Sequence, residues 1–145
     1  MATINASISI SSNIMSYPVS INKTMTMKKA GTCTGLSEST GLATRSYSGT
    51  NNQVDLITVA NESASTTGAN KLYVRNTGSS KVNYFRIGLG ASSTSTTPQE
   101  TEEIGRLYGG DWMLVPYLAE DANWDVMVQP STTEEMTLEY ILFHE

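Results

Sequence analysis

Residues 136–145, MTLEYILFHE, alternate between two kinds of side chain. The even positions carry large apolar side chains: Met136, Leu138, Tyr140 and Leu142. The odd positions between them carry Thr137, Glu139 and Ile141. A period of two is that of a β-strand with one buried face. The stretch therefore predicts a central strand whose even face lies in a hydrophobic core.

Similar short segments recur along the chain and are separated by polar turns, for example at 19–27, 54–60, 71–75 and 82–89. Strands at this spacing, without a convincing helix, predict an all-β fold. We expect a single-domain antiparallel β-sandwich, jelly-roll-like, with about nine strands. We divide the chain into an N-terminal strand or arm, residues 1–12, and a β-sandwich domain, residues 13–145.

The stretch GGDWMLVPY, residues 109–117, combines a glycine turn, an apolar strand and a proline. Metal-dependent double-sheet barrels often carry a turn of this shape, but they need two or three converging histidines. The chain has one histidine, so we interpret the stretch as a structural corner in which Asp111 bonds to the turn backbone. Three side chains are then expected in the core: Trp112, Leu114 and Val115.

The chain is poor in groups that perform chemistry. His144 is its one histidine and Cys33 its one cysteine, which leaves no ordinary Ser-His-Asp triad, disulfide framework or histidine metal site. Two acidic clusters lack the spacing of a calcium loop and are interpreted as exposed loops: Glu100, Glu102 and Glu103, and Glu120, Asp121 and Asp125. A cation at a subunit interface is left open. We expect no catalytic residue, no cofactor and no metal, and a protein that is not an enzyme.

Charge is divided unevenly along the chain, whose net charge is −5. Residues 1–98 carry eight Lys or Arg against three acids, and residues 99–145 carry eleven acids against one Arg. We expect no nucleic-acid binding, because contact with phosphates needs a dense basic surface. We also expect no signal peptide and no membrane span, since the N-terminal residues have no basic stretch before an apolar run and no long apolar run occurs.

Two groups of residues are candidates for contact with other molecules. Residues 2–10 alternate cleanly, and one face carries Ile4, Ala6, Ile8 and Ile10. This segment could pair with the sheet edge of a neighbour or form the first strand of the chain's own sandwich, and the sequence leaves both open. The second group consists of aromatic residues expected in the core or at a subunit interface, with a sugar-stacking platform as the alternative: Trp112, Tyr117 and Trp124.

The second half of the chain holds three characteristic stretches: KLYVRNTGSSKVNYFRIGLG (71–90), EIGRLYGGDWMLVPY (103–117) and MTLEYILFHE (136–145). The first two join strands through glycine-containing turns, and the third is the alternating strand. With these stretches the chain resembles small β-structured virion proteins of tailed bacteriophages. The resemblance is to capsid decoration (cement) proteins, notably of phages that infect marine and cyanobacterial hosts.

The resemblance implies a sandwich or jelly roll without enzymatic activity that binds the outer capsid surface and stabilises the shell. The implied partners are the major capsid protein or other virion proteins and further copies of the chain, with a homotrimer favoured. The implied location is the capsid surface of the virion, after assembly in the host cytoplasm. Two alternatives stay open: a minor virion protein of the tail, baseplate, collar or fibre attachment, and a carbohydrate-binding β-sandwich module.

Overall fold

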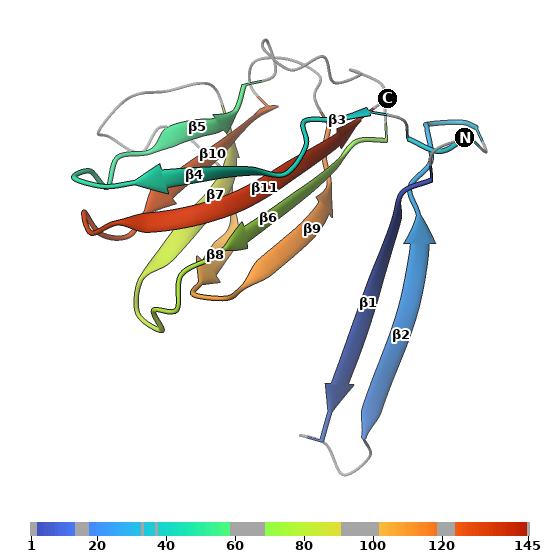
Figure 1. Ribbon diagram of the computed structural model, residues 1–145, viewed down its shortest axis with the longest axis horizontal. Helices are drawn as coiled ribbons and strands as arrows, with labels where there is room; N and C mark the ends of the chain where they lie inside the picture. Colours follow the sequence, from blue (N-terminus) through green and yellow to red (C-terminus); the bar gives the residue numbers. More distant parts are fainter. Residues whose placement is uncertain are drawn as a thin grey trace.

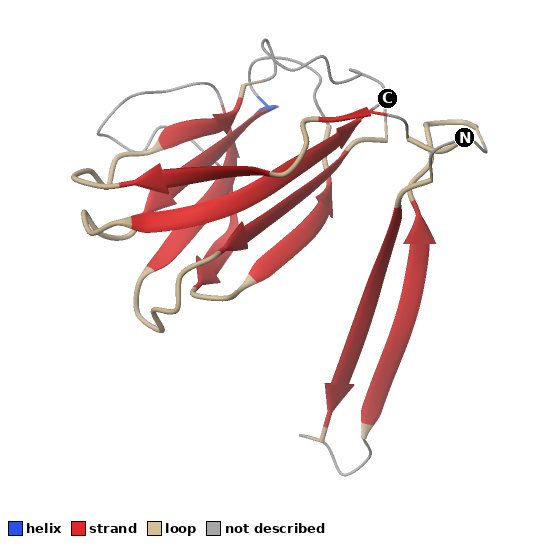
Figure 2. Ribbon diagram, in the orientation of Figure 1, coloured by secondary structure: helices blue, strands red, loops and turns tan. Residues whose placement is uncertain are grey.

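A computed structural model describes residues 3–13, 18–32, 34–36, 38–58, 69–90, 102–118 and 124–144. Its named elements are all strands, and among the described residues only Trp124, directly before β10, has helical geometry of the 3₁₀ type (Figure 2); this confirms the predicted all-β class. They are β1 (Asn5–Ser12), β2 (Val19–Thr26), β3 (Glu38–Ser39), β4 (Ala43–Tyr47), β5 (Val54–Ile57), β6 (Lys71–Asn76), β7 (Tyr84–Gly90), β8 (Glu102–Tyr108), β9 (Trp112–Pro116), β10 (Asp125–Pro130) and β11 (Met136–His144). Within the described residues these are eleven strands, one of which, β3, has only two residues and shows no alternation.

Two antiparallel sheets lie one behind the other and form the body of the protein (Figure 1). One sheet has the order β5-β10-β7-β8, and the other has the order β3-β11-β6-β9, with β4 also paired to β11. The hydrophobic core takes side chains from both sheets, such as Phe85 and Val128 from the first and Leu72 and Leu138 from the second. The body is therefore β-sandwich-like. Jelly-roll connectivity stays a prediction.

β11 is a central strand, because it pairs with β6 on one side and with β3 and β4 on the other. Leu138 and Leu142 on its even face are 0% exposed. Thr137 and Glu139 lie on the opposite face and are partly exposed. The alternation of the sequence therefore predicted the core face of this strand correctly.

The prediction for β9 is wrong at two positions. Pairing with β6 sets Val115 beside Leu72 and Met113 beside Val74, so Val115 and Met113 share the core face. Trp112 and Leu114 consequently lie on the outer face of the sheet, with Trp112 51% exposed. The segment WMLV is apolar at every position, so its own pattern does not choose a face, and the register with β6 does.

The turn before β9 is a structural corner, as predicted. Gly110 has a φ of 90°, which is unfavourable for a residue with a Cβ atom. Gly109 lies against the backbone of Ser79 and Ser80, and its N–H donates to the Ser80 carbonyl over 2.9 Å. The Asp111 carboxylate accepts a hydrogen bond from the Tyr108 N–H over 3.0 Å. These contacts join the β8–β9 turn to the β6–β7 connection.

β1 and β2 form a separate antiparallel hairpin that extends away from the body (Figure 1). We call residues 5–12 and 19–26 the arm. Its base is held where the Met27 N–H donates to the Ile4 carbonyl over 2.9 Å and where Met27 and Leu36 are buried. Within the described residues, neither strand of the arm pairs with a strand of the two sheets. β1 is thus not a strand of the chain's own sandwich, and β2 accompanies it.

Candidate interaction surface

The arm has one apolar face, and that face is exposed. The register sets Ile10 opposite Ile21 and Ala6 opposite Met25. Its large apolar side chains are Ile8, 40% exposed, Ile10, 46%, Ile21, 41%, Met25, 41%, and Val19, 37%. Lys23, opposite Ile8, is the only charged residue in the two strands. These apolar side chains share one face of the hairpin, which Lys23 interrupts, and we call it the apolar face of the arm.

The other face of the arm is polar, and its side chains form hydrogen bonds between the two strands. The Ser7 and Thr24 hydroxyls share a hydrogen bond of 2.9 Å, and the Thr26 hydroxyl donates to the Asn5 side-chain carbonyl over 2.8 Å. Cross-strand pairs of this kind stabilise a hairpin modestly. An isolated two-stranded hairpin is at best marginally stable in water, so the arm gains stability if its apolar face is covered.

A groove of about 530 Å³ separates the arm from the outer face of the β3-β11-β6-β9 sheet. On the arm side it is lined by Ala6 and Ser7. On the sheet side it is lined by residues of β6, of β9 and of the turn before β9: Tyr73, Arg75, Gly110, Trp112 and Leu114. Leu114 is paired with Tyr73 and Trp112 with Arg75 in the β6–β9 register. The groove thus combines exposed apolar surface with one guanidinium.

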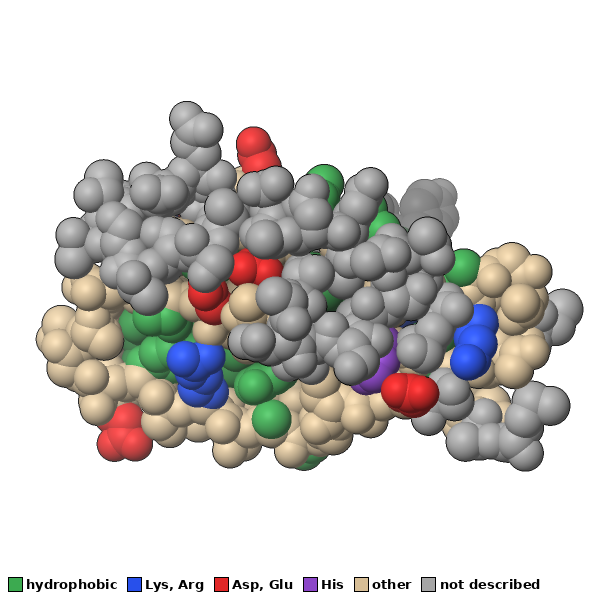
Figure 3. Space-filling view, turned by 90° about the horizontal axis from the view of Figure 1, so that it is seen from above, with side chains coloured by type: hydrophobic (Ala, Val, Ile, Leu, Met, Phe, Trp, Pro, Cys, Tyr) green, Lys and Arg blue, Asp and Glu red, His purple; other side chains and the backbone are tan. Residues whose placement is uncertain are grey.

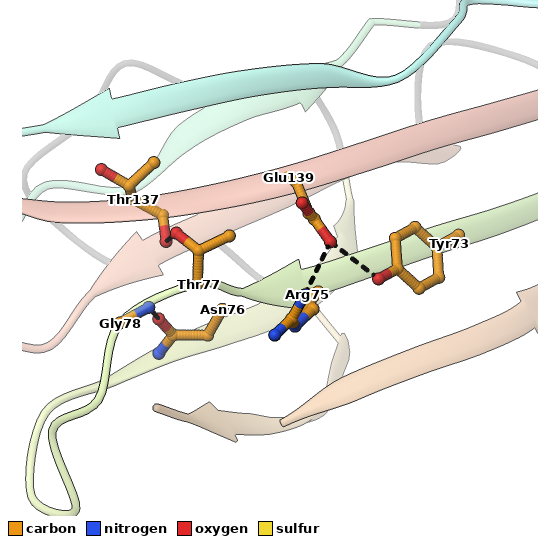
Figure 4. Close-up of polar contacts among 7 residues, drawn as sticks. All are labelled: Tyr73, Arg75, Asn76, Thr77, Gly78, Thr137 and Glu139. Atoms are coloured by element: carbon orange, nitrogen blue, oxygen red, sulfur yellow. Dashed lines mark hydrogen bonds and ion pairs between the residues drawn. The ribbon is translucent and has the colours of Figure 1, made fainter. Parts of the chain in front are cut away.

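Glu139 orients two of the groove residues (Figure 4). Its Oε1 accepts hydrogen bonds from the Tyr73 hydroxyl over 2.9 Å and from Arg75 Nη1 over 3.3 Å. Burial raises the pKa of Tyr73, and the hydrogen bond to Glu139 raises it further. The phenol therefore stays protonated at neutral pH and acts as a donor. These hydrogen bonds orient the aromatic ring and the guanidinium within the chain itself.

The residues that the sequence predicted for contact with other molecules lie in different parts of the structure. Ile8 and Ile10 lie on the apolar face of the arm, and Ile4 is partly buried at its base. The aromatic trio separates, with Trp112 at the groove, Trp124 37% exposed before β10, and Tyr117 4% exposed in the core cluster. The Tyr117 hydroxyl donates to the Trp124 carbonyl over 2.8 Å. Tyr117 is therefore a core residue of this chain and does not belong to the exposed surface.

The sequence did not identify Tyr73 and Leu114 as parts of an exposed surface. The alternation of residues 19–25 was visible, but it carried no sign that Ile21 and Met25 would remain uncovered. The sequence did contain a signal for the hairpin, namely that residues 4–10 and 19–25 both alternate and both carry Ser, Asn or Thr on the second face. That pattern describes an amphipathic hairpin whether it is covered or exposed.

The acidic clusters differ from the predicted exposed loops. Asp125 is 0% exposed, because it begins β10 and pairs with Gly90, so its placement in an exposed acidic loop is wrong. Glu102 and Glu103 are exposed on β8. Cys33, Glu100, Glu120 and Asp121 lie outside the described residues.

His144 is buried at the end of β11. It is 7% exposed, and its Nδ1 lies 3.8 Å from Glu38 Oε2. Figure 3 shows the histidine in purple beside an acidic side chain in red. Among the residues that the structure describes, no three His, Cys, Asp or Glu side chains gather in a group that could hold a metal ion.

Comparison with protein-family models, with curated proteins and with solved structures finds no match for this chain. The described part of the chain contains no helix with the length and hydropathy needed to cross a bilayer. The exposed arm and the neighbouring groove are therefore the candidate surface for contact with another molecule.

Proposed function

We propose that this protein is a non-enzymatic structural component of a tailed-bacteriophage virion. In this proposal it is a decoration (cement) protein that binds the outer capsid surface and stabilises the shell. The observation that carries the proposal is the arm, whose apolar face is left exposed. Exposed apolar side chains that lie next to one another often mark an interaction site, whereas single scattered ones do not. The resemblance to decoration proteins is the reason for proposing a phage capsid as the assembly to which the arm binds.

The body supports the same role. Its two sheets enclose a shared core, and its longest strand is central and buried on one face. A sheet-rich body in which the backbone groups are paired suits a protein that has to persist outside a cell. The expected partners are the major capsid protein or other virion proteins and further copies of the chain. The expected location is the capsid surface.

Electron cryo-microscopy of particles that contain this chain tests the proposal directly. We expect density for a β-sandwich with a protruding hairpin on the outer capsid surface, in a copy number that follows the capsid lattice. Density confined to the tail, baseplate, collar or fibre attachment, in few copies, would replace the decoration role with the minor-virion alternative. Particles without such density would contradict a virion role altogether.

A binding assay examines the stabilising function separately. The full-length protein is added to purified particles that lack it, and the temperature of genome release is measured with a DNA-binding dye. We expect a higher release temperature with the parent protein. Bovine serum albumin at equal concentration serves as the control for unspecific stabilisation. An unchanged release temperature despite binding would remove the cement role and leave only decoration.

A carbohydrate-binding module is a second candidate, because Trp112 is 51% exposed at the edge of a groove that also contains Tyr73. Exposed aromatic rings can serve as stacking platforms for sugars. A glycan array with the parent and with Trp112→Ala tests this candidate. Binding that is lost in Trp112→Ala but kept in Trp124→Ala would support it, and an array without signal would exclude the glycans it contains.

A further inference from the structure

We infer that the apolar face of the arm packs against the outer face of the β3-β11-β6-β9 sheet in a second copy of the same chain. The contact lies where Tyr73 and Leu114 are partly exposed and Trp112 protrudes. The inference goes beyond the proposed function, since it concerns the isolated protein and is tested without any particle.

The receiving surface is an apolar row that crosses three strands. Ile141 on β11, Tyr73 on β6 and Leu114 on β9 are paired side by side, and all three are partly exposed. Trp112, which is 51% exposed, flanks this row. Three neighbouring strands thus present apolar side chains on a face that does not belong to the core. Such a row matches a partner that also has paired apolar side chains, as the arm has in Ile10 and Ile21.

The arm of the same chain does not cover this row. It borders the groove through Ala6 and Ser7 near its base. Farther along the arm, Ile8, Ile10 and Ile21 remain 40–46% exposed. The groove of about 530 Å³ is therefore open beside an arm whose large apolar residues remain exposed. Two uncovered apolar surfaces on one chain can both be covered if copies exchange their arms.

The dimensions of the arm fit a stable contact. Each of its strands has eight residues, so at a rise of about 3.3 Å per residue and a width of about 10 Å for two strands, one face measures about 260 Å². One arm on one sheet then buries about 500 Å² in total, and two reciprocal contacts bury about 1,000 Å², which is the lower limit for a specific interface. A single contact falls below that limit and should associate only weakly, so a closed assembly with two or more contacts should be much the more stable form.

The number of the surfaces favours a second copy over an unrelated protein. Every chain supplies one arm and one receiving face, so a closed symmetric assembly covers all of them and leaves none over. Charge does not oppose the contact, since the arm carries only Lys23 and the receiving face carries Glu139 paired with Arg75.

Sedimentation equilibrium of the full-length protein tests the inference. We expect the parent to form a closed oligomer of two or three chains at micromolar concentration. Ile10→Asp on the apolar face of the arm and Trp112→Asp on the receiving face should each yield monomers, with at least a tenfold weaker association. Ser9→Asp, on the polar face of the arm, is the matched control and should associate like the parent. A cooperative urea transition in each of the four proteins would show that the body remains folded.

Mixing the two monomeric variants identifies which surfaces meet. Ile10→Asp keeps an intact receiving face, and Trp112→Asp keeps an intact arm, so their mixture should form a mixed dimer through one intact contact, weaker than the parent. If the mixture stays monomeric, arms meet arms or the contact lies elsewhere, and the inference is wrong. A monomeric parent, or dissociation by Ser9→Asp, overturns it as well. A monomeric variant that still binds particles would leave the proposed function standing.

Discussion

Gly109→Ala is a substitution for which the structure predicts a large effect of a single added methyl group. A Cβ atom at this position would lie 2.6 Å from three backbone atoms of Ser79 and Ser80. Ordinary contacts between nonbonded carbon atoms are about 3.5–4.0 Å, so the two turns would have to move apart by about 1 Å. Backbone atoms cannot rotate away as the end of a flexible side chain can.

The movement strains the hydrogen bonds that hold the corner. The Gly109 N–H donates to the Ser80 carbonyl over 2.9 Å, and the Gly110 N–H donates to the Asn76 carbonyl over 3.0 Å. Overpacking alone destabilises by about 1–3 kcal/mol, and a lost backbone hydrogen bond adds about 0.5–1.5 kcal/mol. We therefore expect Gly109→Ala to lower the free energy of unfolding by about 2–4 kcal/mol.

Two other glycines supply graded controls. Gly110 has open space around its Cβ position but a φ of 90°, so Gly110→Ala should cost about 1–2 kcal/mol for the unfavourable backbone conformation. Gly105 on β8 has open space and no positive φ, and Gly105→Ala should change stability by less than about 0.5 kcal/mol.

Urea denaturation followed by tryptophan fluorescence measures all three variants. With a slope near 2 kcal/mol per molar urea, the midpoint of Gly109→Ala should fall by about 1–2 M. If Gly109→Ala and Gly105→Ala unfold at the same midpoint, the close approach of the two turns is not a feature of the folded protein.

Three further perturbations follow from the core and its polar contacts. Leu138→Asp should prevent folding, because it puts an unpaired charge on a fully buried face. Thr137→Asp lies on the opposite face and should still give a cooperative thermal transition by circular dichroism. The same melting temperature for both variants would show that the two faces of β11 are assigned wrongly. Asn76→Ala should destabilise by about 1–3 kcal/mol in urea, because the buried Asn76 amide donates to the Leu107 carbonyl and accepts from the Gly78 N–H; an unchanged midpoint would show that neither bond matters. Burial raises the pKa of Tyr47, so the contribution of this phenol to stability is complete below about pH 10, where tyrosine in the unfolded chain begins to ionise, and declines as the pH rises further. Tyr47→Phe should therefore lose less stability with rising pH than the parent in urea titrations at alkaline pH. An identical dependence of stability on pH in both proteins would refute this prediction.

The sequence alone predicted the features that depend on local pattern. The alternation in residues 136–143 predicted the core face of β11, and Leu138 and Leu142 are indeed fully buried. The Gly-Gly-Asp run predicted the corner, where Gly110 takes its positive φ and Asp111 bonds to the turn backbone. Period two and the backbone freedom of glycine are properties of a few consecutive residues, so they can be read without knowledge of the fold.

Tertiary structure decided which of the possible faces is covered. WMLV in β9 is apolar at every position, and only its register with β6 placed Val115 inside and Trp112 outside. The alternation of residues 4–10 is equally compatible with a sandwich strand and with an arm, and only the absence of pairing to the described sheets identified the arm. The physical reason is the same in both cases. A strand's own residues define two faces, but the neighbours that bury one of them come from distant parts of the chain or from another molecule.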